Sequence, residues 1–286
     1  CRETFFLKTM ICQVQCQQSV FGLSVWGRWA TVSRLDVMCL GSDPLVEPFP
    51  HSVVFLHRAI FRHSAIFPHK GTRMFWLKDR AVLITGGTGM VGSALTKQLI
   101  QSGHEVVILT RRARRSDHPL IQYKSWDPSQ NQLDETAIRT ADYIVHLAGA
   151  NVAEKRWTVN RKQEILESRV RSGEFLVESL KKIPNRVKAV LGASAQGWYG
   201  ADPLIPNPNP FVETDPAHSD FLGSTCQSWE QSLQPLSSMG IRLIQLRIGI
   251  VLSTSGGALA EFIKPVRLGI SPILGNGKQV ISWIHL

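Results

Sequence analysis

The pattern of hydrophobic positions becomes regular from about residue 80 onward. Ala81–Thr85 form a short apolar run, and Val91, Ala94, Leu95 and Leu99 then recur at the spacing of one helix face. The pattern predicts a buried strand that is followed directly by an amphipathic helix.

The same alternation continues to the end of the chain. Further apolar runs are typical of strands, and a long amphipathic stretch that starts after Trp157 and stops at Pro184 is typical of a helix. Continuously apolar strands that alternate with helices indicate a parallel sheet covered on both sides. The sequence therefore predicts an α/β fold, a doubly wound parallel sheet with helices on both faces. The further strands are expected at 104–110, 121–126, 143–149, 187–194 and within 241–252, and a proline-rich loop at 203–216.

Residues 1–73 lack this regularity. Hydrophobic, basic and cysteine residues mix there without a sustained period of two or 3.6 residues, and acidic residues are few. Met74 stands shortly before the first convincing strand. We expect residues 1–73 to be a poorly ordered leader of uncertain fold, Met74 to lie near the natural start, and residues 74–286 to be the folded domain.

Charge and cysteine content narrow the classes of partner. The net charge is +10, but lysines and arginines are scattered, with one dense cluster at 111–115 and no zinc-finger, RNP or heptad pattern. We therefore expect no nucleic-acid partner, and no membrane span, because no apolar run approaches the roughly 18 residues required. Cys12 and Cys16 have metal-like spacing without a second pair, so no metal site is expected. Cys226 alone follows the leader, which favours a reducing, cytoplasmic location.

Three glycines lie in the connection between the first predicted strand and the first predicted helix. Gly86 permits a tight turn, Gly89 lets a pyrophosphate approach the backbone, and Gly92 lets helix and strand pack closely. The helix start offers free N–H groups and a partial positive charge to phosphates. With a strand before it and a helix after it, the loop predicts a dinucleotide site of the Rossmann type. A purely structural turn is the alternative.

The end of the second strand bears on the choice of cofactor. An acidic residue there would bind the ribose hydroxyl of NAD, whereas this chain carries Thr110, Arg111 and Arg112. An arginine suits the 2′-phosphate of NADP, and Asp117 lies too far along the chain to replace it. The sequence favours NADP over NAD. The alternative is that the arginines belong to a solvated loop.

Several separated motifs then resemble a known family. The TGGTGMVG stretch at 85–92, with HLAGA at 146–150, resembles the extended and atypical short-chain dehydrogenase/reductases. More narrowly, the sequence is similar to the sugar-nucleotide epimerase-like family, of the NAD-dependent epimerase/dehydratase type. The resemblance covers about Val82 to Leu286 and rests on LAGANVAEKRW at 147–157, ESR at 167–169, GASAQGWYG at 192–200, GGALAEFIKPVRLG at 256–269 and the final WIHL.

The resemblance implies an NADP-binding Rossmann domain and an oxidoreductase or epimerase that acts on a nucleotide-sugar-like or other small polar substrate. It also implies that Thr110 and Arg111 hold the adenosine phosphate, that Leu147 and Ala148 line the cofactor, and that Glu164 and Arg169 face the same cleft. The full set of expected cofactor-binding residues is Gly86, Thr88, Gly89, Met90, Val91, Gly92, Thr110, Arg111, Leu147, Ala148, Glu164 and Arg169.

The chain departs from the wider superfamily in its catalytic pair. Short-chain dehydrogenases usually use a Tyr and, four residues later, a Lys. Aligned on Glu230, this sequence has Leu222 and Cys226 at those positions, and neither side chain can do that work. Ser194 and Tyr199 are the remaining catalytic candidates, with Tyr199 either a substitute acid or a packing residue. The departure supports an alternative function, a catalytically weak NADP-binding sensor or partner-binding protein.

Length is a second departure. Members of the family continue beyond WIH into a C-terminal segment that caps the substrate, whereas this chain stops at Leu286. We expect the chain to be a fragment that lacks this segment. The substrate, the reaction direction and the oligomeric state are left open by the sequence.

Overall fold

The computed structural model describes residues 36–39, 81–112, 114–205, 207–254, 256–270, 273, 277 and 279–286. Apart from one short strand, the predicted leader therefore lies outside the described residues, as do Met74, Cys12 and Cys16. That strand, β1 (Asp36–Cys39), pairs antiparallel with the last strand of the main sheet. No described helix has the length and apolar character that a membrane span requires.

Six parallel strands form the centre of the main sheet. Their order across the sheet is β8-β7-β6-β2-β3-β4, so the direction of winding reverses at β2, which lies between β3 and β6. This order is that of the doubly wound Rossmann fold, and the predicted fold class is confirmed. β1 and β5 (Gln132–Leu133) pair antiparallel at the two edges. The parallel strands are β2 (Ala81–Thr85), β3 (Glu105–Thr110), β4 (Ile121–Asp127), β6 (Tyr143–His146), β7 (Ala189–Ala195) and β8 (Arg242–Ile248).

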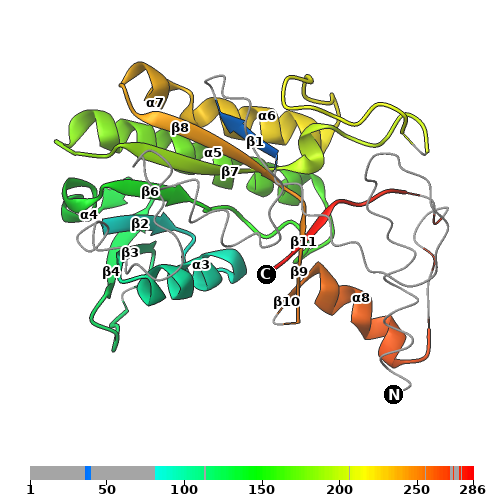
Figure 1. Ribbon diagram of the computed structural model, residues 1–286, viewed down its shortest axis with the longest axis horizontal. Coiled ribbons are helices and arrows are strands. Elements are labelled where there is room, and N and C mark those ends of the chain that lie inside the picture. The colour runs from blue at the N-terminus through cyan, green and yellow to red at the C-terminus, as the bar shows by residue number, and fades with distance from the viewer. Residues whose placement is uncertain are drawn as a thin grey trace, which may run out of the picture.

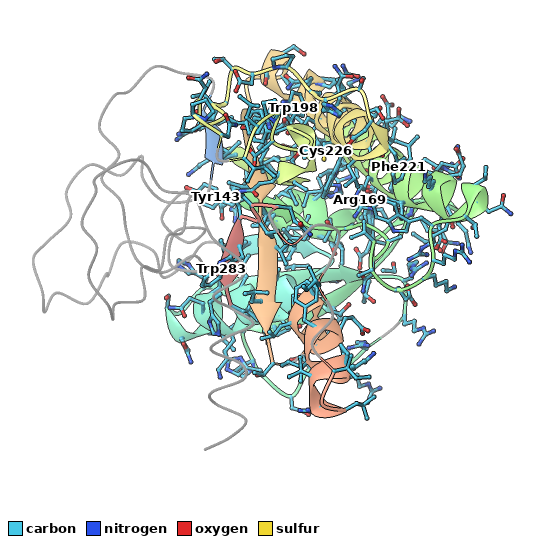
Figure 2. All side chains as sticks on the ribbon, turned by 90° about the vertical axis from the view of Figure 1, so that its right-hand side faces the viewer. Tyr143, Arg169, Trp198, Phe221, Cys226 and Trp283 are labelled. Carbon is cyan, nitrogen blue, oxygen red and sulfur yellow. The ribbon has the colours of Figure 1, made fainter. Side chains whose placement is uncertain are left out.

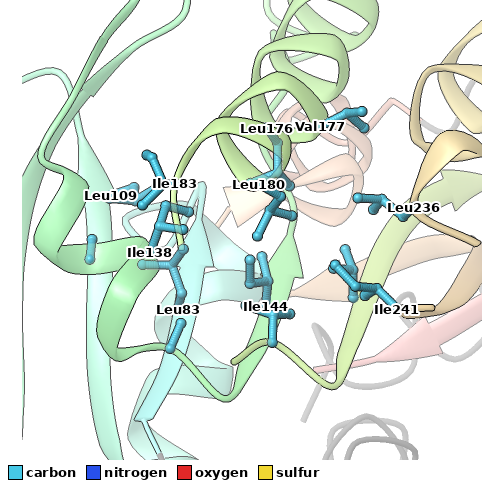
Figure 3. Packing of buried hydrophobic residues seen from close by; sticks show 14 of the residues in the cluster. Leu83, Leu109, Ile138, Ile144, Leu176, Val177, Leu180, Ile183, Leu236 and Ile241 are labelled. Atoms are coloured by element: carbon cyan, nitrogen blue, oxygen red, sulfur yellow. The ribbon is translucent and has the colours of Figure 1, made fainter. Parts of the chain in front are cut away.

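Helices cover both faces of this sheet (Figure 1). On one face α3 (Met90–Gln101) packs through Leu95 and Leu99 against alternate strand residues such as Val82 and Ile84. The other helices near the sheet pack on the opposite face, where the residue between those two, Leu83, joins a second core (Figure 3). They are α4 (Glu135–Thr140), α5 (Val159–Lys182), α6 (Phe221–Leu233) and α7 (Pro235–Ser238).

The sequence pattern places most elements within two residues of their observed ends. Gly103 ends the first helix with a φ of +84°, as a glycine after a helix does. The fourth strand stops at His146 rather than Gly149, although the amide of the next residue, Leu147, still donates to the carbonyl of Thr85 on β2. The short elements α4 and β5 carry too few residues to show a period and were not predicted.

The sixth apolar run divides between two sheets. After β8 the chain passes through Gly249, where a side chain would lie 2.7 Å from the carbonyl oxygen of Ser282. It continues as the middle strand of a three-stranded sheet, beyond the carboxyl ends of the main strands. This sheet consists of β9 (Ile250–Ser253), β10 (Gly256–Gly257) and β11 (Trp283–His285), and α8 (Ala258–Arg267) follows β10.

Candidate functional site

The glycine loop after β2 lies at the carboxyl edge of the sheet, at the point where the strand order reverses. Gly86 has a φ of +68°, and a Cβ there would lie 2.8 Å from the carbonyl carbon of Leu147. Gly86 thus allows the loop to pass against the chain that leaves β6. The position next to a strand-order reversal is the usual ligand site of open α/β sheets.

The other glycines of the loop differ in what surrounds them. At Gly92 an added Cβ would lie 2.5 Å from the carbonyl oxygen of Gly86, so a side chain would push the helix away from the turn. At Gly89 the nearest atom is the same oxygen, at 3.2 Å, and Gly89 itself is exposed. A side chain at Gly89 would therefore make one tight contact with the turn and would otherwise occupy the exposed space through which a phosphate would approach the backbone.

The start of α3 is suited to an anion. Gly89 is the N-cap residue, no side chain caps the helix there, and its first turn contains no acidic residue. Thr88 is exposed, while Met90 and Val91 are half-buried in the first turn. A side chain at Gly257 would come within 3.0 Å of Cε of Met90, so β10 lies next to this helix start. Backbone N–H groups and the helix dipole are left for a phosphate at this point.

The end of β3 carries the residues that were predicted to select the cofactor. Thr110 is the last residue of the strand, and its hydroxyl accepts a hydrogen bond from the amide of Arg112 at 3.3 Å. The side chain of Arg111 is exposed. Because β3 neighbours β2 in the sheet, Thr110 and Arg111 share the carboxyl edge with the glycine loop.

Leu147 and Ala148 form the opposite side of the site. Their amides donate to the hydroxyl oxygen of Thr85 at 3.1 Å and 3.2 Å. That oxygen lies 2.8 Å from Nδ1 of His146, and Nε2 of the same ring lies 3.2 Å from the hydroxyl of Ser172 on α5. Burial lowers the pKa of His146 to about 4. A neutral histidine therefore connects the strand before the glycine loop to the segment after β6 and to α5.

Arg169 reaches the same edge from α5. A side chain at Gly149 would come within 3.1 Å of Cζ of Arg169, and the guanidinium lies 4.8 Å from the centroid of the Trp229 ring. Nη1 donates to the carbonyl of Ile165 at 2.9 Å. Burial lowers the pKa of Arg169. The structure thus places Arg169 beside the chain that follows Leu147 and Ala148.

Glu164 is placed differently. Its side chain is 56% exposed, and it accepts a hydrogen bond of 2.6 Å from Nη1 of Arg161. Arg161 is buried and also donates to the carbonyl of Asn151 and to the carboxylate of Glu154. Glu164 therefore contacts the segment after β6 through Arg161, whereas Arg169 lies against that segment directly.

The face of α6 that should carry the catalytic pair packs under the turn that follows β7. This turn includes the 3₁₀ helix η2 (Gln196–Trp198). A side chain at Gly197 would lie 3.1 Å from Cβ of Leu222 and 3.7 Å from Sγ of Cys226. Burial raises the pKa of Cys226 to about 11, so its thiol stays protonated at neutral pH. Figure 2 shows Cys226 with Arg169 and Phe221 on the neighbouring helices α5 and α6.

Ser194 and Tyr199 both take part in a buried polar cluster. The Ser194 hydroxyl donates to Oε1 of Glu230 at 2.6 Å, and the Tyr199 hydroxyl accepts from Nη1 of Arg247 at 3.1 Å. Arg247 and Glu230 form an ion pair, with Nε and Oε1 separated by 2.9 Å. Ser194 is 3% exposed and Tyr199 is 7% exposed. The structure therefore joins the two catalytic candidates through Glu230 and Arg247.

A separate cavity of about 480 Å³ lies away from this edge. It opens between α5 and the segment from β4 to α4, and none of the predicted site residues lines it. Its lining combines charged side chains such as Arg171 and Glu174 with apolar ones such as Phe175. The glycine-loop edge, rather than this cavity, therefore carries the chemistry expected from the sequence.

Comparison with known proteins identifies the class. Residues 82–286 match the model of the NAD dependent epimerase/dehydratase family, and the chain belongs to this family. An epimerase family protein of Staphylococcus saprophyticus is 39% identical over 204 residues, which are 71% of this chain and 66% of that protein. The chain thus spans slightly less than two thirds of this curated relative.

Solved structures are similar as well. The human epimerase family protein SDR39U1, crystallised with NADPH, is 29% identical with a TM-score of 0.60, over 72% of this chain and 65% of that one. A nucleoside-diphosphate sugar epimerase from Corynebacterium glutamicum is 33% identical with a TM-score of 0.59, over 72% of this chain and 41% of that one.

Three residues of the site region were not singled out from the sequence as parts of a polar network. His146 lies within a predicted strand, Arg247 lies in an apolar run, and Glu230 was used only to align the positions of the catalytic pair. A polar residue inside a predicted buried strand was the available signal, because such a group needs a partner.

Proposed function

We propose that this chain binds NADP across the carboxyl ends of β2, β3 and β6, and that it serves as an oxidoreductase or epimerase for a nucleotide-sugar-like or other small polar substrate. The observation that carries the proposal is the start of α3. It has no side-chain cap, no acidic residue in the first turn, and an exposed glycine, Gly89, at the N-cap. These features suit a pyrophosphate.

The surrounding residues fit the rest of a dinucleotide. Thr110 and Arg111 would hold the adenosine phosphate, since an arginine provides a charged partner for a 2′-phosphate. Leu147 and Ala148 would line the opposite side, and Arg169 would place a cation beside them. The NADPH in the similar human structure supports NADP as the cofactor. When bound, NADP supplies a hydride donor or acceptor at its nicotinamide ring.

The name of the similar Corynebacterium protein supports the substrate class. A nucleotide sugar is also the kind of substrate that the family resemblance implies. We also propose a reducing compartment, the cytoplasm, because Cys226, which lies in the folded domain, is a free thiol.

Binding is tested by titrating the chain with NADPH. Gly89→Val should lower the affinity at least ten-fold, because the branched side chain fills the space that a phosphate needs. Gly89 has a φ of −78°, so valine is tolerated by the backbone and the far-ultraviolet circular dichroism should be unchanged. Gly103→Ala, at the other end of the same helix, is the control and should bind as the wild type does. Normal binding by Gly89→Val would show that the loop is only a turn.

Cofactor choice is tested by comparing NADPH with NADH. Arg111→Asp should move the preference toward NADH, because the 2′-phosphate loses a cation and meets a like charge. Arg112→Asp makes the same change of charge one position later and should have the smaller effect. An unchanged ratio of the two dissociation constants in Arg111→Asp would remove Arg111 from the site.

A second candidate function is a catalytically weak NADP-binding sensor or partner-binding protein. It is favoured by Leu222, which has no exchangeable proton, and by Cys226, which is a neutral buried thiol. Hydride exchange with a panel of carbonyl compounds separates the two functions. Rapid turnover that depends on Tyr199 or Ser194, as tested with Tyr199→Phe and Ser194→Ala, would favour the enzyme. Tight NADPH binding without turnover would favour the sensor.

A further inference from the structure

A buried arginine lies under the part of the sheet edge that is distant from the glycine loop. Arg247, near the carboxyl end of β8, has a relative exposure of 0%. Its Nε donates to Oε1 of Glu230 at 2.9 Å, and its Nη2 donates to Oε2 at 3.1 Å. Two parallel bonds to one carboxylate fix the orientation of the guanidinium plane as well as its position.

The third nitrogen of Arg247 reaches two segments outside the sheet. Nη1 donates to the hydroxyl of Tyr199 and to the carbonyl of Glu213, both at 3.1 Å. The guanidinium also lies 3.6 Å from the centroid of the Trp198 ring, and Tyr199 stacks on Phe211 at 5.1 Å. One side chain therefore ties β8 and α6 to the turn after β7 and to the proline-rich loop.

The turn that is held in this way covers α6 at the site. Its Gly197 lies against Leu222 and Cys226, and Sγ of Cys226 donates to the carbonyl of Ala195 at 3.6 Å. Movement of the turn would uncover both α6 residues. These are the positions at which the family resemblance places the reacting groups.

We infer that Arg247 is a positioning residue that holds the turn after β7 and the proline-rich loop in place over α6, and so fixes the substrate-side wall of the site. It acts through Trp198, Tyr199 and Glu213. The contact of this wall with a substrate rests on the proposed function. The contacts between Arg247 and the turn do not depend on it.

The chemistry of the side chain suits this task. A guanidinium is planar and stays charged, and it can bond to a carboxylate on one edge while it donates to a hydroxyl and a carbonyl on the other. Ser194 also donates to Oε1 of Glu230, at 2.6 Å, so the carboxylate oxygen that accepts from Nε of Arg247 has a second partner. A buried ion pair of this kind adds little net stability compared with apolar residues, whereas removal of one partner leaves an uncompensated buried charge.

The rate at which iodoacetamide alkylates Cys226 tests the inference. The full chain is used, and mass spectrometry of the peptide that carries Cys226 separates it from the other cysteines. Cys226 is 4% exposed, so the reaction needs the turn to move. We expect Arg247→Met to raise the rate at least ten-fold, and Arg247→Lys to raise it less, because an ammonium keeps the charge but cannot bridge all the partners.

Arg247→Met leaves the Glu230 carboxylate buried without its cation, so the double variant Arg247→Met/Glu230→Gln is measured in parallel to preserve the fold. Its rate should be raised as well. Arg161→Met is the matched control, because Arg161 is also a buried arginine, 5% exposed, that holds a different loop through Asn151. It should react at the wild-type rate. An unchanged rate in the folded Arg247 variants, or an equal rise in Arg161→Met, overturns the inference. The assay contains no nucleotide, so its outcome is independent of the NADPH titrations.

Discussion

Acidification should weaken the fold through one buried histidine. The His146 side chain is fully buried between Thr85 and Ser172. The hydroxyl oxygen of Thr85 already accepts two backbone amides, so its proton is directed at Nδ1 of His146. Nε2 then carries the ring proton and donates to Ser172, whose hydroxyl donates in turn to the carbonyl of Arg169. A second ring proton, on Nδ1, would face the hydroxyl proton of Thr85, so protonation of His146 breaks this series of hydrogen bonds.

The sign and size of the effect follow from the two pKa values. Burial lowers the pKa of His146 from 6.5 to about 4, so the unfolded chain binds the proton first as the pH falls. The free energy of unfolding is therefore unaffected by His146 above pH 6.5 and decreases between pH 6.5 and pH 4. A difference of about 2.5 pKa units corresponds to about 3 kcal/mol, of which about 2 kcal/mol is lost by about pH 5.

Urea unfolding at about pH 7.5 and about pH 5 measures the loss. The wild type and His146→Gln are compared, because an amide can retain part of the hydrogen bonding and does not titrate. The difference between the two cancels the titration of the carboxylates. The exposed histidine variant His118→Gln is the control and should follow the wild type. The same pH dependence in His146→Gln and the wild type would refute the reasoning.

Two further predictions concern stability. Gly86→Ala should lower the free energy of unfolding by about 2–4 kcal/mol, because a φ of +68° is strained for alanine and the added Cβ would meet the Leu147 backbone. Gly103→Ala has a φ of +84° but no atom within 4 Å of the added Cβ, so it should lower this free energy by only about 1 kcal/mol. Equal losses in urea unfolding would contradict the packing argument. Glu230→Gln should cost about 3 kcal/mol in the same assay, because Arg247 is left buried without a carboxylate, and Arg247→Met made in the same chain should recover most of this loss.

The sheet could be predicted because its signals are local. Most of the parallel strands contain an apolar run, such as Ala81–Thr85, and a residue such as Gly103 or Pro184 bounds the neighbouring helix. Some of the elements that were not predicted are short, such as α4 and β5, but the longer helices α6 and α8 were not predicted either. The division of the sixth run at Gly249 depends on the approach of Ser282, which no local pattern reports.

The same distinction applies to the site. The glycine loop and Arg111 lie at fixed offsets from a strand end, so the sequence locates them. The partners of His146 and Arg247 are set by packing between elements that are far apart in the chain: 61 residues separate His146 from Thr85, and 48 separate Arg247 from Tyr199. A buried polar residue can be recognised as needing a partner from the sequence, but the partner is known only when the fold is known.

Arg169 offers a cation that could replace the lysine that the wider superfamily carries at the Cys226 position. A lysine at the Cys226 position would bring a cation to the cofactor from α6, and a tyrosine at the Leu222 position would bring a proton. Arg169 brings a cation to the same edge from α5, beside Gly149, whereas Leu222 has no exchangeable proton and Cys226 is neutral. The chain thus has a cation beside Gly149 but lacks the tyrosine hydroxyl that the wider superfamily carries at the Leu222 position of α6. We therefore expect NADPH to bind tightly and turnover to be slow, since a general acid is typically worth about a hundred-fold to ten-thousand-fold in rate.

Arg169→Met should weaken NADPH binding in titrations. Cys226→Ala should leave both NADPH binding and the rate of single-turnover reactions unchanged. A loss of turnover in Cys226→Ala would show that the proton donor is on α6.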